Sequence, residues 1–128
     1  MAVSIDDFKK LEIKIGQILG VEKIKNTDKL LKLSVDFNEG TFRQIISGIS
    51  SYFSDPQVLV GKKCAFATNL EPRVIMGLES QGMILAVSGL KQPTIDLSHD
   101  STQQNNPGES FFSLLEVEKD VPAGSAVK

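Results

Sequence analysis

The start of the chain changes from a helical to a strand-like spacing of apolar residues. Ser4 and Asp7 stand where the two polar members of an N-terminal capping box stand, and they predict a short helix over 5–9. From position 11 onwards apolar and polar residues alternate, which is typical of a half-buried strand. Gly16 interrupts this alternation, and a glycine inside a strand pattern indicates a bulge or a sharp bend. We therefore expect a long, bent first strand of the kind that a small closed barrel requires.

Four further strands follow from the same analysis. Residues 31–37 and 41–47 flank a three-residue loop that ends in Gly40, which predicts a β-hairpin. Shorter apolar runs predict two more strands at about 62–68 and 83–87. The chain is therefore expected to be dominated by short strands with closely spaced turns.

A short helix is expected between the third and fourth strands. Asp55 and Pro56 can open it, and Gly61 can close it. Five strands with a short helix in this place favour an all-β fold, the five-stranded oligonucleotide-binding (OB) barrel. An SH3-like barrel and a small sandwich are the alternatives that the pattern leaves open.

The composition changes after the predicted barrel. Residues 92–110 are rich in Ser, Thr, Gln, Asn and Asp, which predicts an exposed loop or insertion. An apolar, strand-like segment then opens a C-terminal extension over 111–128. We expect a single domain over 1–128, with its core in 6–90.

Length and composition exclude several classes of protein. At 128 residues with 41% hydrophobic residues, the chain can bury a core without disulfides or metals. No apolar run approaches the roughly 20 residues of a membrane span, and the N-terminus lacks the pattern of a secretion signal. The single cysteine, Cys64, lies in an apolar run, so we expect a buried, unreactive thiol in a cytoplasmic protein.

Charge is distributed unevenly along the chain. Residues 1–91 carry twelve Lys and Arg against ten Asp and Glu, whereas residues 92–128 carry two against six. The net charge of the whole chain is −2. The cations therefore gather in the predicted barrel, which is compatible with an anionic partner without demonstrating one.

Candidate catalytic groups are few. The only histidine, His99, lies between Ser98 and Asp100 in the polar insertion, where a solvated loop residue is the simplest interpretation. One histidine and one cysteine do not make a zinc site, and the sequence contains neither a P-loop nor a glycine-rich dinucleotide motif. We therefore expect no catalytic residue, no metal and no cofactor.

Cations recur on predicted strands that would be neighbours in the sheet. Lys14, Lys32 and Arg43 each stand opposite or offset from the apolar positions of their strand. An OB barrel presents one sheet face and two loops to nucleic acid, so these side chains would contact phosphates or sugars. The alternative is that they only keep this face solvated.

The segment 69–83 concentrates small, polar and basic residues where a strand meets a loop. Its arginine is a fork-shaped donor suited to phosphate or a base edge, and its glycines let the backbone approach a ligand. The thioether of its last residue would pack against an unstacked base. The alternative is a long hairpin loop whose methionine enters the core. The residues concerned are Asn69, Pro72, Arg73, Gly77, Ser80, Gly82 and Met83.

Two motifs closely resemble those of a known family. They are Arg-Gln-Ile-Ile-Ser-Gly-Ile at 43–49, and Asn-Leu-Glu-Pro at 69–72 followed by Ser-Gln-Gly-Met at 80–83. Lys-Ile-Gly at 14–16 and Asp-Lys-Leu at 28–30 also match. The chain resembles the tRNA-binding module that occurs free-standing in bacteria and as the C-terminal appendage of methionyl-tRNA synthetases.

The resemblance implies an OB barrel with a C-terminal pseudo-domain that binds tRNA largely by shape, near the outer corner of the L. It implies a homodimer joined through the N- and C-terminal segments, and it allows a methionyl-tRNA synthetase catalytic chain as a further partner. It implies no catalysis and no preference for DNA. Together with the residue patterns, it predicts tRNA contacts at Lys14, Lys29, Lys32, Arg43, Lys63, Asn69, Arg73, Ser80, Gly82 and Met83.

Three departures from the family pattern lower the expected affinity. Residues 24–27 read Ile-Lys-Asn-Thr where the family often has His-Pro-Asp-Ala, Glu71 stands where Lys is common, and Lys14 replaces Arg. The alternative function is that of a related branch, the CsaA-type export chaperone, on the same barrel. That branch usually carries Arg-Lys-Pro-Ala-Tyr before the second strand, where this chain has Asp-Lys-Leu at 28–30.

Overall fold

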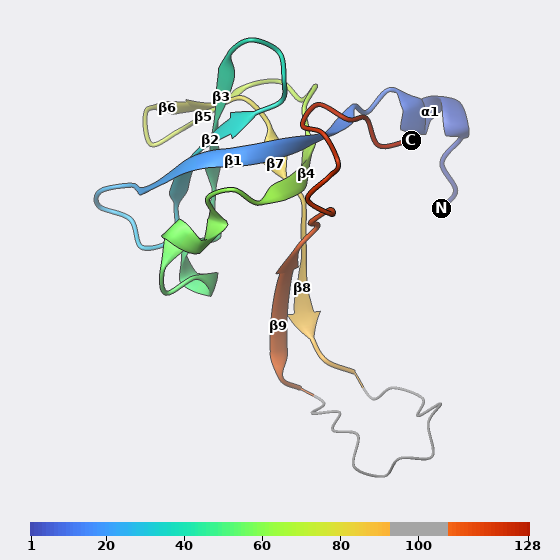
Figure 1. Ribbon diagram of the computed structural model, residues 1–128. Coiled ribbons are helices and arrows are strands. Elements are labelled where there is room, and N and C mark those ends of the chain that lie inside the picture. Colours follow the sequence, from blue (N-terminus) through green and yellow to red (C-terminus); the bar gives the residue numbers. More distant parts are fainter. Residues whose placement is uncertain (93–107) are drawn as a thin grey trace.

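The computed structural model describes residues 1–92 and 108–128 (Figure 1). One short helix precedes the first strand, and two 3-10 turns lie between the third and fourth strands. The elements are α1 (Ile5–Lys9), β1 (Ile13–Lys23), β2 (Leu31–Asp36), β3 (Phe42–Ser47), η1 (Ser50–Tyr52), η2 (Pro56–Leu59), β4 (Lys63–Ala67), β5 (Arg73–Ile75), β6 (Leu78–Ser80), β7 (Met83–Ile84), β8 (Ala86–Leu90) and β9 (Ser110–Leu114).

Five of these strands form one curled antiparallel sheet in the order β3-β2-β1-β4-β7. The other strands form two hairpins, β5–β6 and β8–β9. Figure 1 shows the second hairpin extending away from one end of the barrel. The all-β, OB-like barrel predicted from the sequence is confirmed. The predicted insertion at 92–110 lies mostly outside the described residues.

Alternate residues of the strands fill the barrel, because successive side chains of a strand point to opposite faces. Phe37 meets Phe66 edge to face there, with ring centroids 5.2 Å apart. Cys64 is fully buried, as predicted, and this burial raises the pKa of its thiol to about 11. The largest fully buried side chains are those of Phe66, Ile18, Leu31, Leu33, Ile45, Leu59 and Val35.

The bulge in β1 lies elsewhere than predicted. Pairing with β4 runs without a break through Gly16, whereas pairing with β2 shifts between Ile18 and Gly20. Gly16 has a different reason to be glycine. A Cβ there would lie 2.5 Å from Val35 Cγ1 and 2.6 Å from Phe37 Cε1, too close for any side chain. The glycine therefore lets two core side chains cross over the strand.

The predicted helices and the fifth strand differ in detail from the structure. The helix at 5–9 is confirmed, with the Ser4 hydroxyl accepting from the Asp7 N–H, whereas the helix after Asp55 is a 3-10 turn. The predicted strand at 83–87 is divided into β7 and β8. After Leu85, whose N–H donates to the Ala65 carbonyl, the chain leaves the barrel and pairs with β9.

Candidate nucleic-acid interface

Side chains close the barrel along the free edge of β3. The N–H of Gln81 donates to the Gln44 carbonyl at 2.8 Å, and the N–H of Gln44 donates to Gln81 Oε1 at 2.9 Å. Gln44 Nε2 also donates to the Glu79 carbonyl at 2.9 Å. β3 is thus joined to the end of the β5–β6 hairpin by two glutamines in place of a regular strand ladder. Neither glutamine was predicted to have a role.

Ser80 and Gly82 lie at the same junction between β3 and the end of the β5–β6 hairpin, which we call the seam. The buried Ser80 hydroxyl accepts from the Ile46 N–H at 3.0 Å and donates to the Gly82 carbonyl at 3.1 Å. A Cβ on Gly82 would lie 3.1 Å from the Ala67 carbonyl oxygen and 3.3 Å from Ile45 Cδ1. The Ser-x-Gly part of the motif therefore holds β3 and β4 close together at the point where the barrel closes.

A small cavity of about 70 Å³ lies on the outer side of this seam. Ile46 forms part of its lining and is the cross-strand partner of Lys32, so both side chains share the outer face of the sheet. The seam, the hairpin and Lys32 therefore meet on one continuous surface. The lining residues are Ile46, Leu70, Glu71, Arg73, Ile75, Ser80, Gly82 and Met83.

Four residues of this lining are exposed: Leu70, Glu71, Arg73 and Met83. The Arg73 guanidinium makes no hydrogen bond or ion pair within the described part of the chain. Lys32 is half-buried and pairs with Glu22, with 3.0 Å between Nζ and Oε2. Lys29 is exposed in the β1–β2 loop, where its carbonyl accepts from the Ser50 N–H at 3.0 Å. These three cations therefore come from the sheet face, the β1–β2 loop and the β5–β6 hairpin.

Arg43 lies at one end of the barrel rather than on the outer face. Its Nε and Nη2 donate to the Glu39 carboxylate at 2.6 and 3.1 Å, while Nη1 donates to the carbonyls of Thr68 and Gln81 at 2.7 and 3.2 Å. The guanidinium also stacks 5.3 Å from the centre of the Phe37 ring. Arg43 therefore joins the β2–β3 loop to β4 and to the seam.

Lys14 belongs to the same end of the barrel. Its Nζ lies 3.5 Å from the Glu12 carboxylate, which also accepts from the Thr68 hydroxyl at 2.6 Å. The hydrogen bond from Thr68, and then the charge of Lys14, hold the pKa of Glu12 below its usual value. Both partners of this ion pair remain partly exposed.

Asn69 fastens the residues before β1 to the end of β4. Its Oδ1 accepts from the Glu12 N–H at 2.7 Å, and its Nδ2 donates to the Lys10 carbonyl at 2.7 Å. Both ends of the amide are therefore used within the fold, with a partner almost sixty positions away in the sequence.

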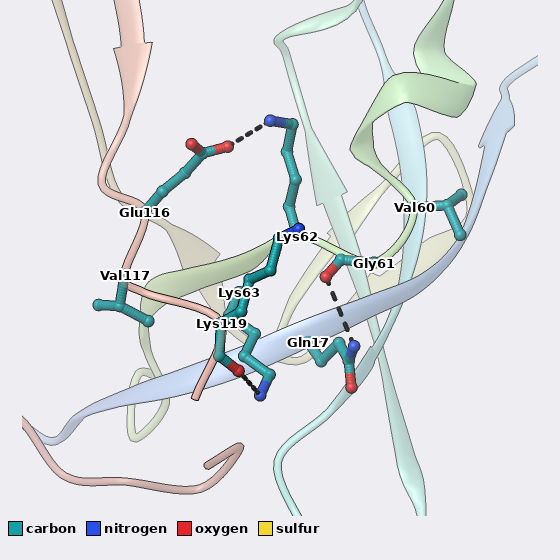
Figure 2. A pocket seen from close by; sticks show the side chains of 8 residues that line it. All are labelled: Gln17, Val60, Gly61, Lys62, Lys63, Glu116, Val117 and Lys119. Carbon is teal, nitrogen blue, oxygen red and sulfur yellow. Dashed lines mark hydrogen bonds and ion pairs between the residues drawn. The ribbon is translucent and has the colours of Figure 1, made fainter. Parts of the chain in front are cut away.

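Lys63 lines a different cavity, of about 520 Å³, under the C-terminal segment (Figure 2). Its Nζ donates to the carbonyls of Lys119 and Val121 at 2.7 and 2.8 Å. Beside it, Lys62 pairs with Glu116 at 2.6 Å. This cavity shares no lining residue with the one at the seam, so the structure does not bring Lys63 together with Arg73.

No metal-binding cluster is found in the described residues. None of their His, Cys, Asp and Glu side chains gather in threes that could hold a metal ion. His99 lies outside the described residues. Among the described residues, no helix has the length and apolar character needed to cross a membrane.

Comparisons with known proteins agree on one family. A family model described as "Putative tRNA binding domain" matches residues 13–126. The methionine–tRNA ligase of Caldanaerobacter subterraneus subsp. tengcongensis is 37% identical over 125 residues, and this alignment covers 98% of the chain but only 16% of the ligase. The chain therefore spans a small part of the length of this relative.

Two solved structures share the fold. The MetRS related protein from Pyrococcus horikoshii is 35% identical, with a TM-score of 0.76 and coverage of 100% of this chain and 99% of that one. The chaperone CsaA from Bacillus anthracis str. Ames has a TM-score of 0.72 at 20% identity, with both chains fully covered. At that identity the second likeness concerns the fold alone.

Proposed function

Since this chain belongs to the tRNA-binding domain family, we propose that it binds tRNA without catalysing a reaction. It acts either as a free-standing factor or as an auxiliary module of a methionine–tRNA ligase, to which its relatives belong. The observation that carries the proposal is the shared outer surface on which Lys32 lies across from Ile46, beside Arg73 and Met83. Cations on this face attract the phosphate backbone of the tRNA. The loops then make contacts that depend on the folded shape of the tRNA.

We further propose a division of labour among the ten predicted residues. Lys29, Arg73 and Met83 are exposed and contact RNA directly, and Lys32 does so from the outer face of the sheet, where it also pairs with the exposed Glu22. The other six have internal partners or tight packing that shape the surface. These six residues are Lys14, Arg43, Lys63, Asn69, Ser80 and Gly82. Direct contact of any of the six with RNA stays a prediction.

Binding to tRNA should depend strongly on salt. Contact with about three to six phosphates predicts that the logarithm of the affinity falls with the logarithm of the salt concentration, with a slope of about −2 to −5. A fluorescence or gel-shift titration of bulk tRNA over a series of salt concentrations measures this slope. Duplex DNA of equal charge is the control, and we expect weaker binding to it. A flat salt response, or equal affinity for both ligands, would contradict the proposal.

We also propose that the chain forms a homodimer through its N-terminal helix. α1 has five residues, none of them buried, and a helix this short is unstable without packing. Ile5, Phe8 and Leu11 are 65, 45 and 40% exposed. The C-terminus lies beside the start of β1, where the Val127 N–H donates to the Ile13 carbonyl at 2.8 Å. The apolar face of α1 and the chain end can therefore form one contact.

Replacing Phe8 with aspartate is expected to convert the dimer to a monomer. A buried, unpaired carboxylate at the contact would oppose association much more strongly than it would disturb the exposed helix. Analytical ultracentrifugation of the wild type and Phe8→Asp measures the change. Val58→Asp removes a similarly exposed apolar side chain at η2 and should leave the mass unaltered. A wild type that sediments as a monomer would remove the dimer from the proposal.

A further inference from the structure

The tip of the β5–β6 hairpin has a residue that the turn does not favour. Ile75 pairs with Leu78, so Met76 and Gly77 form a two-residue turn, and their φ angles are +52° and +78°. Such turns prefer Asn or Gly at both positions, because an L side chain is crowded there. Among the described residues other than glycine, only Met76, Asn26 and Asn38 have positive φ. Local backbone preference therefore does not account for a methionine.

Core packing does not account for it either. The Met76 side chain is 61% exposed, and Val74, which precedes it by two residues on the same hairpin, is 73% exposed. Isolated exposed apolar residues are common, but here they stand beside others on the same connection between β4 and β7. Leu70 and Met83, which line the seam cavity, are 43 and 47% exposed. The hairpin thus carries an unpartnered apolar tip next to the proposed RNA surface.

We propose that Met76 packs against an unpaired, unstacked base of the tRNA, an inference that rests on the proposed function. The faces of a base are flat and apolar, and a polarizable thioether suits contact with an aromatic ring. Arg73 lies at the foot of the same hairpin, on the face that lines the seam cavity, whereas Val74 points to the opposite face, across from Glu79. The Arg73 guanidinium has no internal partner in the described residues, so it can hold the adjoining phosphate. A thioether at the tip and an unpaired guanidinium at the foot of one hairpin fit a nucleotide better than they fit a wholly apolar protein surface.

The test is Met76→Asn, which removes the thioether while introducing the residue that this turn prefers. Asparagine adopts positive φ readily, so the melting temperature should stay equal or rise. The affinity for tRNA should fall by about five- to twentyfold, the lower part of the range for a lost contact with a base. The affinity for a blunt RNA duplex of equal charge, which has no unstacked base, should stay unaltered. Met76→Leu, which keeps an apolar side chain, should retain most of the tRNA affinity.

Several outcomes would overturn the inference while leaving the proposed function in place. One is Met76→Asn binding tRNA as the wild type does. Another is an equal loss for tRNA and duplex, which would indicate an effect on charge or fold. A third is a changed sedimentation coefficient of the variant alone, which would assign the tip to contact with a second copy of the chain. A wild type with no affinity for tRNA would instead overturn the proposed function itself.

Discussion

Alanine at position 73 is expected to weaken tRNA binding by about 1–3 kcal/mol, or roughly 5- to 150-fold, without lowering stability. The Arg73 guanidinium is exposed and has no hydrogen-bond or ion-pair partner in the described residues, so its removal breaks nothing inside the protein. The complex of the alanine variant with tRNA would lack the two parallel hydrogen bonds that the guanidinium donates to a phosphate or a base edge. Fluorescence anisotropy with labelled tRNA measures the affinity, and thermal unfolding measures the stability.

Two further variants give this measurement its controls. Arg73→Lys keeps the charge but loses the planar fork, so an intermediate affinity would indicate paired hydrogen bonds. Lys119→Ala removes one positive charge beside the other cavity, and it should alter tRNA affinity much less. If Arg73→Ala and Lys119→Ala weaken binding equally, Arg73 contributes only to the overall charge, and the surface at the seam is not the RNA site.

The strands of this protein could be predicted from its sequence because their signal is local. Alternation of apolar and polar residues marked the start of β1 and both ends of β2 and β3 within a residue or two, and the Ser4 cap placed α1. The reason for Gly16 is not local. The sequence showed that a glycine interrupts the strand, but only the side chains crossing from β2 and its following loop show why.

The roles of the polar residues could not be predicted in the same way. Asn69, Ser80 and Arg43 stand out in the sequence because they suit neither a core nor an ordinary strand. Their hydrogen-bond partners, however, lie between 25 and 59 positions away, apart from Glu39 and Gly82. No spacing along the chain indicates such partners. The sequence therefore did not separate an arginine that holds the fold together from one that is available to a ligand.

Replacing Arg43 with methionine, which has a similar length and no charge, is expected to lower the free energy of unfolding by about 2–4 kcal/mol. The carbonyls of Thr68 and Gln81 lose their donor, and the Glu39 carboxylate loses its partner. Each hydrogen bond to a charged group contributes about 1.5–3 kcal/mol, and the partial exposure of both side chains reduces the sum. Urea-induced unfolding of the wild type and the variant measures the difference.

A double variant separates the two parts of this loss. Glu39→Gln alone should cost less than Arg43→Met, because Nη1 keeps both of its carbonyl acceptors. Adding Glu39→Gln to Arg43→Met should then recover part of the stability, since it removes an unpaired carboxylate. A stability of Arg43→Met equal to that of the wild type would show that these bonds contribute little to the fold. In that case the guanidinium would be available to RNA, and Arg43 would move from the residues that shape the surface to those that bind the ligand.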